Sequence, residues 1–357
     1  MRVAVLWVGI CLIGELAGAQ MAAAQTVGTK TAVTPDAPRG PSYDTSYYKS
    51  FKGSIIIRAF LSRNYSILKL NPPGSLPLMK YSANTPLNIG LGFSYRSVSV
   101  SVSKGLGFLQ SGERKGDTHS FDLQAHVYKR KWTIDGLAQF YKGYYLSDPG
   151  LGQPGLGGPF YLRPDMQVQT VGLSVCRVLN DRRFSYGAGL AQNAIQEKSA
   201  GSFLIGGNAL YTAVHADSAL APYKIDTLYN REDIAKTHLF EIGVGFGYAY
   251  TYVFEKHYFL LGSATVNLDA YFSRELGSGI KSDKIGLSPD YFVHLGAGYN
   301  ARRWGLSAVW FTGGVSAMGE RSGYRYGVHT GSYRLVYARR LAINRKMKGI
   351  LEGNPVY

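Results

Sequence analysis

The residues that could do chemistry gather in one hairpin, around the basic turn at 129–130. If these two residues form the turn, His126 lies opposite Thr133 and Gln124 lies opposite Asp135. His126 and Asp135 are then diagonal neighbours on one face of a sheet. An aspartate that orients a histidine activates the nucleophile in many hydrolases, so the pair would suit lipid or acyl hydrolysis. No convincing serine accompanies it, and the four side chains equally suit a satisfied polar network inside the fold.

Other signatures of catalysis are missing from the sequence. There is no nucleophile elbow, no HExxH helix and no Cys/His spacing for a metal. Gly-x-Gly quartets recur, among them GLGF at 90–93 and GFGY at 245–248, but none opens a helix after a buried strand, as a nucleotide-binding loop would. We therefore expect no enzymatic activity, no metal and no cofactor.

Strict alternation of apolar and polar residues indicates the elements that hold these groups. In 88–108 the apolar residues change from odd to even positions at one point, near Arg96-Ser97. A two-residue turn explains the change, because residues that flank such a turn face each other on one side of the sheet. The predicted pairs are Tyr95 with Val98, Phe93 with Val100, and Leu91 with Val102.

Short turns alternate with long Gly/Pro-rich connections along the chain. With strands of roughly ten residues and an aromatic outward face, this pattern is typical of a bacterial membrane barrel rather than a soluble sandwich. We predict an all-β, antiparallel up-and-down transmembrane β-barrel with short periplasmic turns and long extracellular loops. About twelve strands are expected, within a range of roughly ten to fourteen, and the status of 201–214 stays open. The predicted strands are 53–70, 87–95, 98–108, 118–128, 131–142, 167–178, 183–193, 237–253, 257–273, 289–300, 303–312 and 322–338.

The N-terminus reads as a cleaved secretory signal. Its apolar run, which ends at Glu15, is too short for a membrane helix, and small-residue cleavage sites end at Ala19 and Ala24. We predict a signal peptide at 1–24, an N-terminal periplasmic segment at 25–52, the barrel at 53–338 and a basic C-terminal tail at 339–357. The expected location is the outer membrane of a Gram-negative bacterium. After cleavage only Cys176 remains, so no intramolecular disulfide can form.

The net charge of +16 is concentrated in the short turns and the tail. By the loop-length rule these turns are periplasmic, so they form a basic rim that could face lipid phosphates, a periplasmic protein or an acidic polymer. Nucleic acid is not an expected partner, because the chain is exported and has no basic helix or stacking motif. The rim residues are Arg96, Lys129, Arg130, Lys131, Arg182, Arg183, Arg302 and Arg303.

The inward face of the barrel could line a passage for a solute, or it could form a network of hydrogen-bonded polar side chains. The interior of a barrel of about eight strands is filled by side chains, whereas 16–18 strands leave an aqueous channel. About twelve strands therefore leave three possibilities open: a narrow passage, a lumen plugged by a loop, or no passage at all. Beyond the hairpin at 129–130, further polar candidates for this face are Asp122, Glu241, Asn267, Asp269, His294 and Arg325.

Four segments resemble an uncharacterised family of outer-membrane proteins from the Bacteroidetes, "domain of unknown function 4421". They are YKSFKGSIIIRAFLSRNYSIL, PLNIGLGFSYRSVSVSVSKGLGFL, DLQAHVYKRKWTIDGLAQFYKGYYL and QEKSAGSFLIGG, within about residues 45 to 338. The resemblance implies an exported barrel and supplies no activity and no functional residue. Ser97 stands where the first tight turn would be expected to have glycine.

Three functions follow from these observations. The first is a porin-like narrow channel or transport-associated barrel of unknown substrate, motivated by the small and polar inward stripe. The second is a non-conducting structural or interaction barrel that binds lipid or a periplasmic partner through the basic rim. The third is a lipid hydrolase in the barrel wall that uses His126 and Asp135.

Overall fold

The structure is a computed structural model, and it describes residues 42–51, 53–74, 76–95, 98–107, 113–147, 160–221 and 233–343. Residues 43–357 form one unit, to which the fold described below belongs. The predicted signal peptide, the start of the N-terminal segment and the end of the C-terminal tail lie outside the described residues. Within these residues, no helix is long and apolar enough to cross a membrane.

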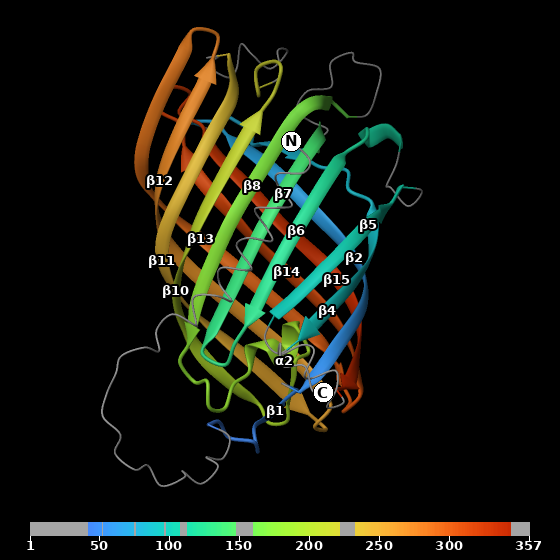
Figure 1. Cartoon of the computed structure of the whole chain (residues 1–357). Helices are drawn as coiled ribbons and strands as arrows, with labels where there is room; N and C mark the ends of the chain where they lie inside the picture. Colours follow the sequence, from blue (N-terminus) through green and yellow to red (C-terminus); the bar gives the residue numbers. More distant parts are fainter. Residues whose placement is uncertain are drawn as a thin grey trace, which may run out of the picture. The chain divides into compact units, whose positions relative to one another are not determined.

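Within the described residues, twelve antiparallel strands form a closed ring (Figure 1). Each strand pairs with its sequence neighbour in the ring, and the last strand pairs with the first from Arg325–Asn71 to Ala342–Ser54. Closure leaves the sheet without a free outer strand, as hydrocarbon requires. The strands are β2 (Ser54–Asn71), β4 (Leu87–Tyr95), β5 (Val98–Leu106), β6 (His119–Tyr128), β7 (Trp132–Leu146), β8 (Leu162–Val178), β10 (Ala200–His215), β11 (Ile234–Phe254), β12 (Tyr258–Gly277), β13 (Ile280–Asn300), β14 (Trp304–Met318) and β15 (Arg325–Ala342).

Smaller elements lie at the two ends of the ring. Strand β3 (Met79–Ser82) bridges β2 and β7, and a 3-10 turn spans Glu113–Lys115. Strands β1 (Tyr48–Ser50) and β9 (Ala194–Gln196) form a separate two-stranded sheet, beside the short helix α2 (Tyr186–Leu190). We call the end with Ser54 and Ala342 the terminal end, and the opposite end the distal end.

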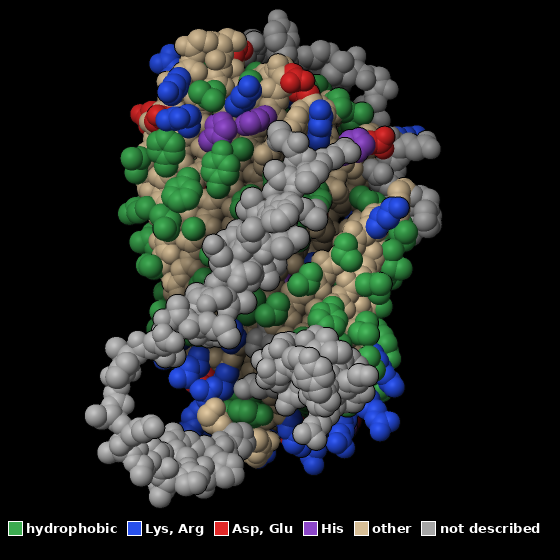
Figure 2. Space-filling view, in the orientation of Figure 1, with side chains coloured by type: hydrophobic (Ala, Val, Ile, Leu, Met, Phe, Trp, Pro, Cys, Tyr) green, Lys and Arg blue, Asp and Glu red, His purple; other side chains and the backbone are tan. Residues whose placement is uncertain are grey.

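The outer face of the ring is apolar and the middle of the inner face is polar. Large outward side chains are freely exposed, for example Val244 at 75% and Ile285 at 78%, whereas inward Thr251 and Ser263 are buried. Green apolar side chains accordingly cover much of the visible wall in Figure 2. This is the reverse of a soluble protein and is the pattern of a transmembrane β-barrel, in which every second side chain meets lipid. The predicted fold class is confirmed.

The predicted register is right in one hairpin and wrong in another. Tyr95 pairs with Val98, Phe93 with Val100 and Leu91 with Val102, although Arg96 and Ser97 themselves lie outside the described residues. At 129–130 the connection is longer than two residues. Tyr128 pairs with Thr133, and the Lys129 amide donates to the Trp132 carbonyl at 2.9 Å. His126 is therefore directly opposite Asp135, and Gln124 is opposite Leu137.

One predicted strand is wrong and an undecided one is real. Residues 183–193, which were predicted to be a strand, contain α2, and residues 201–214, which were left undecided, lie within β10. One strand replaces the other, so the predicted count of twelve is still right. The alternation of Phe184, Tyr186, Ala188 and Leu190 imitates a strand because three of these four residues are buried inside the ring. Consequently the long loop predicted at 194–236 contains a strand, and a long connection at 179–199 lies at the terminal end. The connection predicted at 274–288 is mostly strand, because β12 and β13 extend to Gly277 and from Ile280.

Both ends of the lumen are filled. At the distal end a buried apolar cluster includes Leu68, Tyr81, Met166 and Tyr326, each essentially inaccessible. At the terminal end α2 and its flanking residues pack against inward side chains of the wall, including Leu204 and Leu261. Packed side chains of this kind narrow the lumen at both described ends.

Candidate binding chamber in the lumen

The segment 184–193 fills the terminal end of the ring, and we call it the plug. Its main-chain and side-chain groups bond to strands around the wall. The Gln192 amide donates to the Ser307 hydroxyl at 2.6 Å, and Arg58 donates to the Ala191 carbonyl at 3.1 Å. Arg340 donates to the Gln192 carbonyl at 3.2 Å and to the Ala301 carbonyl at 2.6 Å. The plug is therefore a folded part of the barrel.

Small residues let the plug fit. Gly189 packs so closely on β12 that a methyl group there would lie 2.7 Å from Cδ2 of Leu261. A methyl group at Gly187 would collide with the Asn193 amide. Two glycines in a helix cost helical propensity, and here they allow a tight approach that larger side chains would prevent.

Between the plug and the distal cluster lies a chamber of two adjoining cavities. The larger has a volume of about 80 Å³ and the smaller about 50 Å³. His126, His294 and Phe311 line both cavities. These volumes admit a few waters or a small polar group.

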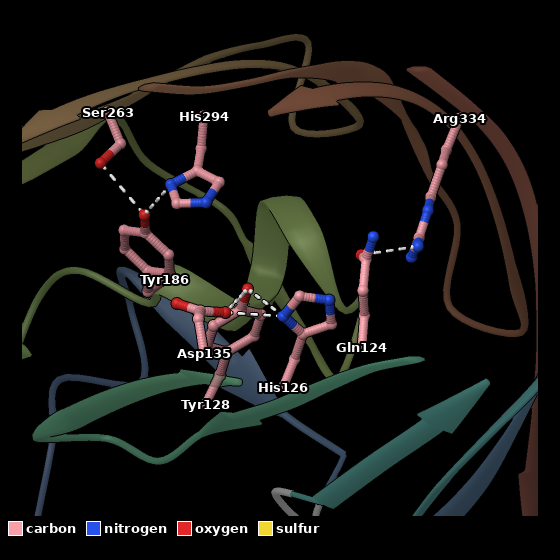
Figure 3. A network of polar contacts seen from close by, with 8 residues as sticks. All are labelled: Gln124, His126, Tyr128, Asp135, Tyr186, Ser263, His294 and Arg334. Atoms are coloured by element: carbon pink, nitrogen blue, oxygen red, sulfur yellow. Dashed lines mark hydrogen bonds and ion pairs between the residues drawn. The ribbon is translucent and has the colours of Figure 1, made fainter. Parts of the chain in front are cut away.

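The predicted pair His126 and Asp135 meets in this chamber. Nδ1 of His126 lies 2.6 Å from Oδ1 of Asp135, and the Tyr128 hydroxyl donates to the same oxygen at 2.7 Å (Figure 3). The Asp135 carboxylate thus fixes the orientation of the imidazole, as in a catalytic dyad. Among the hydrogen bonds of the described residues, none joins His126 to a serine, threonine or cysteine. The geometry matches a satisfied polar network better than a hydrolase.

A second polar contact joins the plug to the wall. The Tyr186 hydroxyl lies 2.9 Å from Nδ1 of His294 and donates to the Ser263 hydroxyl at 3.1 Å. Its ring also packs edge-on against Tyr128, with centroids 5.4 Å apart. Figure 3 shows both groups of residues pointing into the same space. His294, predicted only as an inner-face residue, is therefore part of the chamber.

Two arginines that we did not single out in the sequence also face the chamber. Arg58 of β2 is 6% exposed, and Arg334 of β15 donates to Oε1 of Gln124 at 2.8 Å. Arg334 stacks over Phe60 and Phe311, with 5.3 and 5.2 Å from its guanidinium carbon to the ring centroids. Within the described part of the chain neither guanidinium forms an ion pair with a carboxylate, and Nε of Arg334 is buried without a hydrogen-bond partner. In the sequence, Arg58 follows the outward residue Ile57 and Arg334 follows the outward residue Tyr333. Because successive residues of a strand face opposite sides, this alternation could have placed both arginines on the inner face.

The remaining predicted inner-face residues divide into three groups. Asp122 accepts hydrogen bonds from Gln139 and Tyr141 at 2.6 and 2.5 Å, and Thr133 is a buried part of the chamber wall. Glu241, Asn267 and Asp269 are buried, away from the chamber. Arg325 is exposed, so its predicted inward position is wrong. At the distal end the inward face is apolar, with Tyr324 and Tyr326 buried. The apolar residues of this segment therefore face inward and Arg325 faces outward, the opposite of what was predicted.

Three buried carboxylates meet on β11, β12 and β13. Oxygen atoms of Glu241, Asp269 and Asp290 all lie within 4.8 Å of one another. The Ser316 amide donates to Glu241 at 2.8 Å and Asn208 donates to Asp269 at 3.2 Å. Three such oxygen ligands are of the type that Ca²⁺ or Mg²⁺ prefers. Asp290 was not singled out in the sequence, although the predicted strand 289–300 contains it, and the absence of a metal stays a prediction.

The basic rim occupies the terminal end, where blue side chains gather in Figure 2. Six of its members are exposed, and Arg96 lies outside the described residues. Arg130 is paired with Asp181 at 2.9 Å, and the Arg183 guanidinium carbon lies 5.1 Å from the centroid of the Tyr47 ring. The exposed members are Lys129, Lys131, Arg182, Arg183, Arg302 and Arg303.

The N-terminal segment is joined to the region beside the plug. Residues 48–50 pair with 194–196 in register. The Tyr48 hydroxyl donates to the Asp181 carbonyl at 3.0 Å, and burial raises the pKa of this hydroxyl, so it stays protonated.

The family model for a domain of unknown function, DUF4421, matches residues 42–337. The chain is a member of the DUF4421 family. This confirms the family that the four sequence segments resembled. No curated protein sequence matches this DUF4421 chain.

Solved structures similar to this DUF4421 protein include bacterial outer-membrane proteins. The Escherichia coli outer membrane protease OmpT has a TM-score of 0.38 and 7% identity, over 82% of this chain and 98% of that one. The β domain of the Bordetella autotransporter BrkA has a TM-score of 0.33 and 12% identity, over 79% and 98%. The Pseudomonas putida toluene transporter TodX has a TM-score of 0.28 and 9% identity, over 80% and 89%.

Proposed function

We propose that this DUF4421 member is an outer-membrane barrel of a Gram-negative bacterium that binds a small anionic ligand in its lumen. It is transport-associated and has no standing pore. The observation that carries the proposal is the pair Arg58 and Arg334, two guanidinium groups that face the chamber and have no carboxylate partner among the described residues. A buried charge without an ion-pair partner is costly, and an anion offsets that cost.

The filled ends favour gated passage or simple binding over an open channel. Hydrogen bonds, for example those from Arg58 and Gln192, help to hold the plug, and such contacts can exchange with water when the plug moves. The distal cluster is apolar and would move less easily.

The anion site is tested on purified, refolded barrel by the temperature at which its folded, fast-migrating band disappears from a detergent gel. Inorganic phosphate should raise this temperature by several degrees, because a ligand that binds only the folded state stabilises it. The shift should vanish in Arg58→Gln/Arg334→Gln and persist in Arg339→Gln, whose side chain is exposed on the outer face of β15. An equal shift in the double variant would overturn the anion site.

The absence of a standing pore is tested in a planar bilayer. We expect the intact barrel to be silent, because both ends of the lumen are filled. Discrete conductance steps from the unmodified protein would contradict this part of the proposal.

A second function is favoured by one further observation. The exposed members of the rim lie together at the terminal end, away from the chamber, and could bind anionic lipid or an acidic periplasmic partner. The hydrolase alternative has no such support, because none of the hydrogen bonds of the described residues joins His126 to a serine, threonine or cysteine.

A further inference from the structure

The wall of the barrel is incomplete between β5 and β6. These strands pair at only three positions, from Val98–Val127 to Val100–Ala125, whereas every other neighbouring pair in the ring shares eight or more. If the register continued, Ser101 would pair with Gln124 and Val102 with Leu123. Figure 1 shows the two strands close together toward the terminal end and apart above it.

The gap is bounded on all sides, so it is a window rather than an open edge. Above it, β3 pairs with β2 from Ile67–Ser82 to Leu70–Met79 and with β7 at Tyr81–Leu146. The Asn84 amide and side chain then bond to Thr118 and Gly116 at 2.8 and 2.9 Å. Residues 101–106 and 119–124 form the sides, without a partner strand across the gap among the described residues. In hydrocarbon such edges carry unsatisfied backbone groups, which are tolerated only where they are buried in protein or line a water-filled cavity.

The window leads to the two arginines. Ser99 and Ser101 of β5 and His126 of β6 line the smaller cavity together with Arg58 and Arg334. On the outer side the window is flanked by apolar residues that face lipid, with Val102 72% and Phe121 46% exposed. The cavity that holds the two arginines therefore reaches the inner side of the gap at Ser99 and Ser101, and Val102 and Phe121 lie on its outer side.

We propose that the β5–β6 window is a lateral opening through which a single-chain anionic amphiphile reaches Arg58 and Arg334 from the bilayer. This inference rests on the proposed anion site and adds its route and ligand class. The acyl chain stays in the window and the hydrocarbon, while a carboxylate or phosphate head accepts hydrogen bonds from the two guanidinium groups. Both ends of the lumen are filled, so the side wall is the remaining route.

The route is tested by closing the window reversibly. In a Cys176→Ser background, Val102→Cys/Leu123→Cys places two thiols on the same outward face of β5 and β6, where they meet only if the strands zip together. The matched control is Val98→Cys/Val127→Cys, at a pair that is already in register. Each barrel is placed in phospholipid vesicles with spin-labelled dodecanoate, and the immobilised fraction is measured by electron spin resonance.

We expect immobilised label in the unmodified and control barrels, at least a tenfold loss in the oxidised Val102→Cys/Leu123→Cys barrel, and recovery after reduction. Ser101→Phe, which fills the inner side of the window without a crosslink, should give the same loss. Undiminished binding in either the oxidised variant or Ser101→Phe would overturn the lateral route.

Two further experiments test the role of the head group and distinguish failure of the lateral route from failure of the anion site. Dodecanoate and dodecyl phosphate are compared with dodecanol as competitors, and displacement by either anion supports the inference, whereas equal displacement by dodecanol contradicts a role for the arginines. If phosphate still stabilises the oxidised barrel while label binding is unchanged, the window fails and the anion site stands. If phosphate stabilises no form, the anion site itself fails.

Discussion

Tyr186 in the plug and His294 in the wall lie 108 residues apart in sequence, and their side chains meet at 2.9 Å. The same hydroxyl donates to Ser263 on the next strand. One side chain thus ties the filling of the lumen to two strands of its wall, at the border of the chamber.

Tyr186→Phe should lower the free energy of unfolding by about 1–3 kcal/mol, because it leaves the His294 and Ser263 groups without their buried partner. Urea titration of the folded gel band measures the change. Tyr248→Phe is the control, since the Tyr248 side chain is 46% exposed on the outer face. Equal stability of the two variants would show that the plug contact is not maintained in the membrane.

Arg340→Ala should loosen the plug. Its guanidinium donates to the carbonyls of Gln192, Ala301 and Trp304 and to Asn300, at 2.6–3.2 Å, and their loss leaves several buried acceptors unpaired. A destabilisation of about 3 kcal/mol or more is expected. Trypsin should then cut the 179–199 connection at least tenfold faster. Arg339→Ala, one residue away and exposed, should leave the cleavage rate unchanged.

Gly243→Ala should destabilise the barrel by about 2 kcal/mol. A methyl group there would collide with the Asp269 carboxylate and with the Leu268 carbonyl, which belongs to a paired strand and cannot turn aside. Gly262→Ala is the matched test, because its nearest neighbour, Cδ2 of Leu295, is 3.8 Å away. Thermal loss of the folded band should distinguish them, and a stable Gly243→Ala barrel would mean that the carboxylates are not packed on β11.

Neutralising the rim should weaken its attachment to acidic surfaces. Lys129, Lys131, Arg302 and Arg303 are exposed, and their joint replacement by Gln should reduce cosedimentation with anionic vesicles at least tenfold at low salt. Arg130 is left in place because it is paired with Asp181. Raising the salt concentration should weaken binding of the unmodified barrel in the same way. A quadruple variant that cosediments as well as the unmodified barrel would exclude the rim.

The strands were predictable because lipid and lumen impose opposite polarity on successive residues. This logic placed Leu91 and Val244 on the outer face and found eleven of the twelve ring strands. It failed for 183–193, where alternating apolar residues are buried inside the ring and form a helix. It also failed at Arg325, because the distal end has an apolar interior.

The candidate site was only partly predictable. His126, Asp135, Gln124 and Thr133 were found, but their register depended on a turn length that the basic turn residues do not specify. Arg58 and Arg334 lie on different strands at opposite ends of the sequence, and only closure of β2 on β15 brings them to one cavity. The plug likewise depends on contacts across the lumen, for which alternation gives no signal.

Closure by β2 and β15 also restricts the order of assembly. The plug is encoded between β8 and β10, so it has already left the ribosome when the final strand of the ring becomes available. A loop that bonds to β2, β12, β13 and β14 from within cannot be threaded through a finished wall without breaking those contacts. We therefore expect insertion of the cylinder and filling of its interior to be coupled.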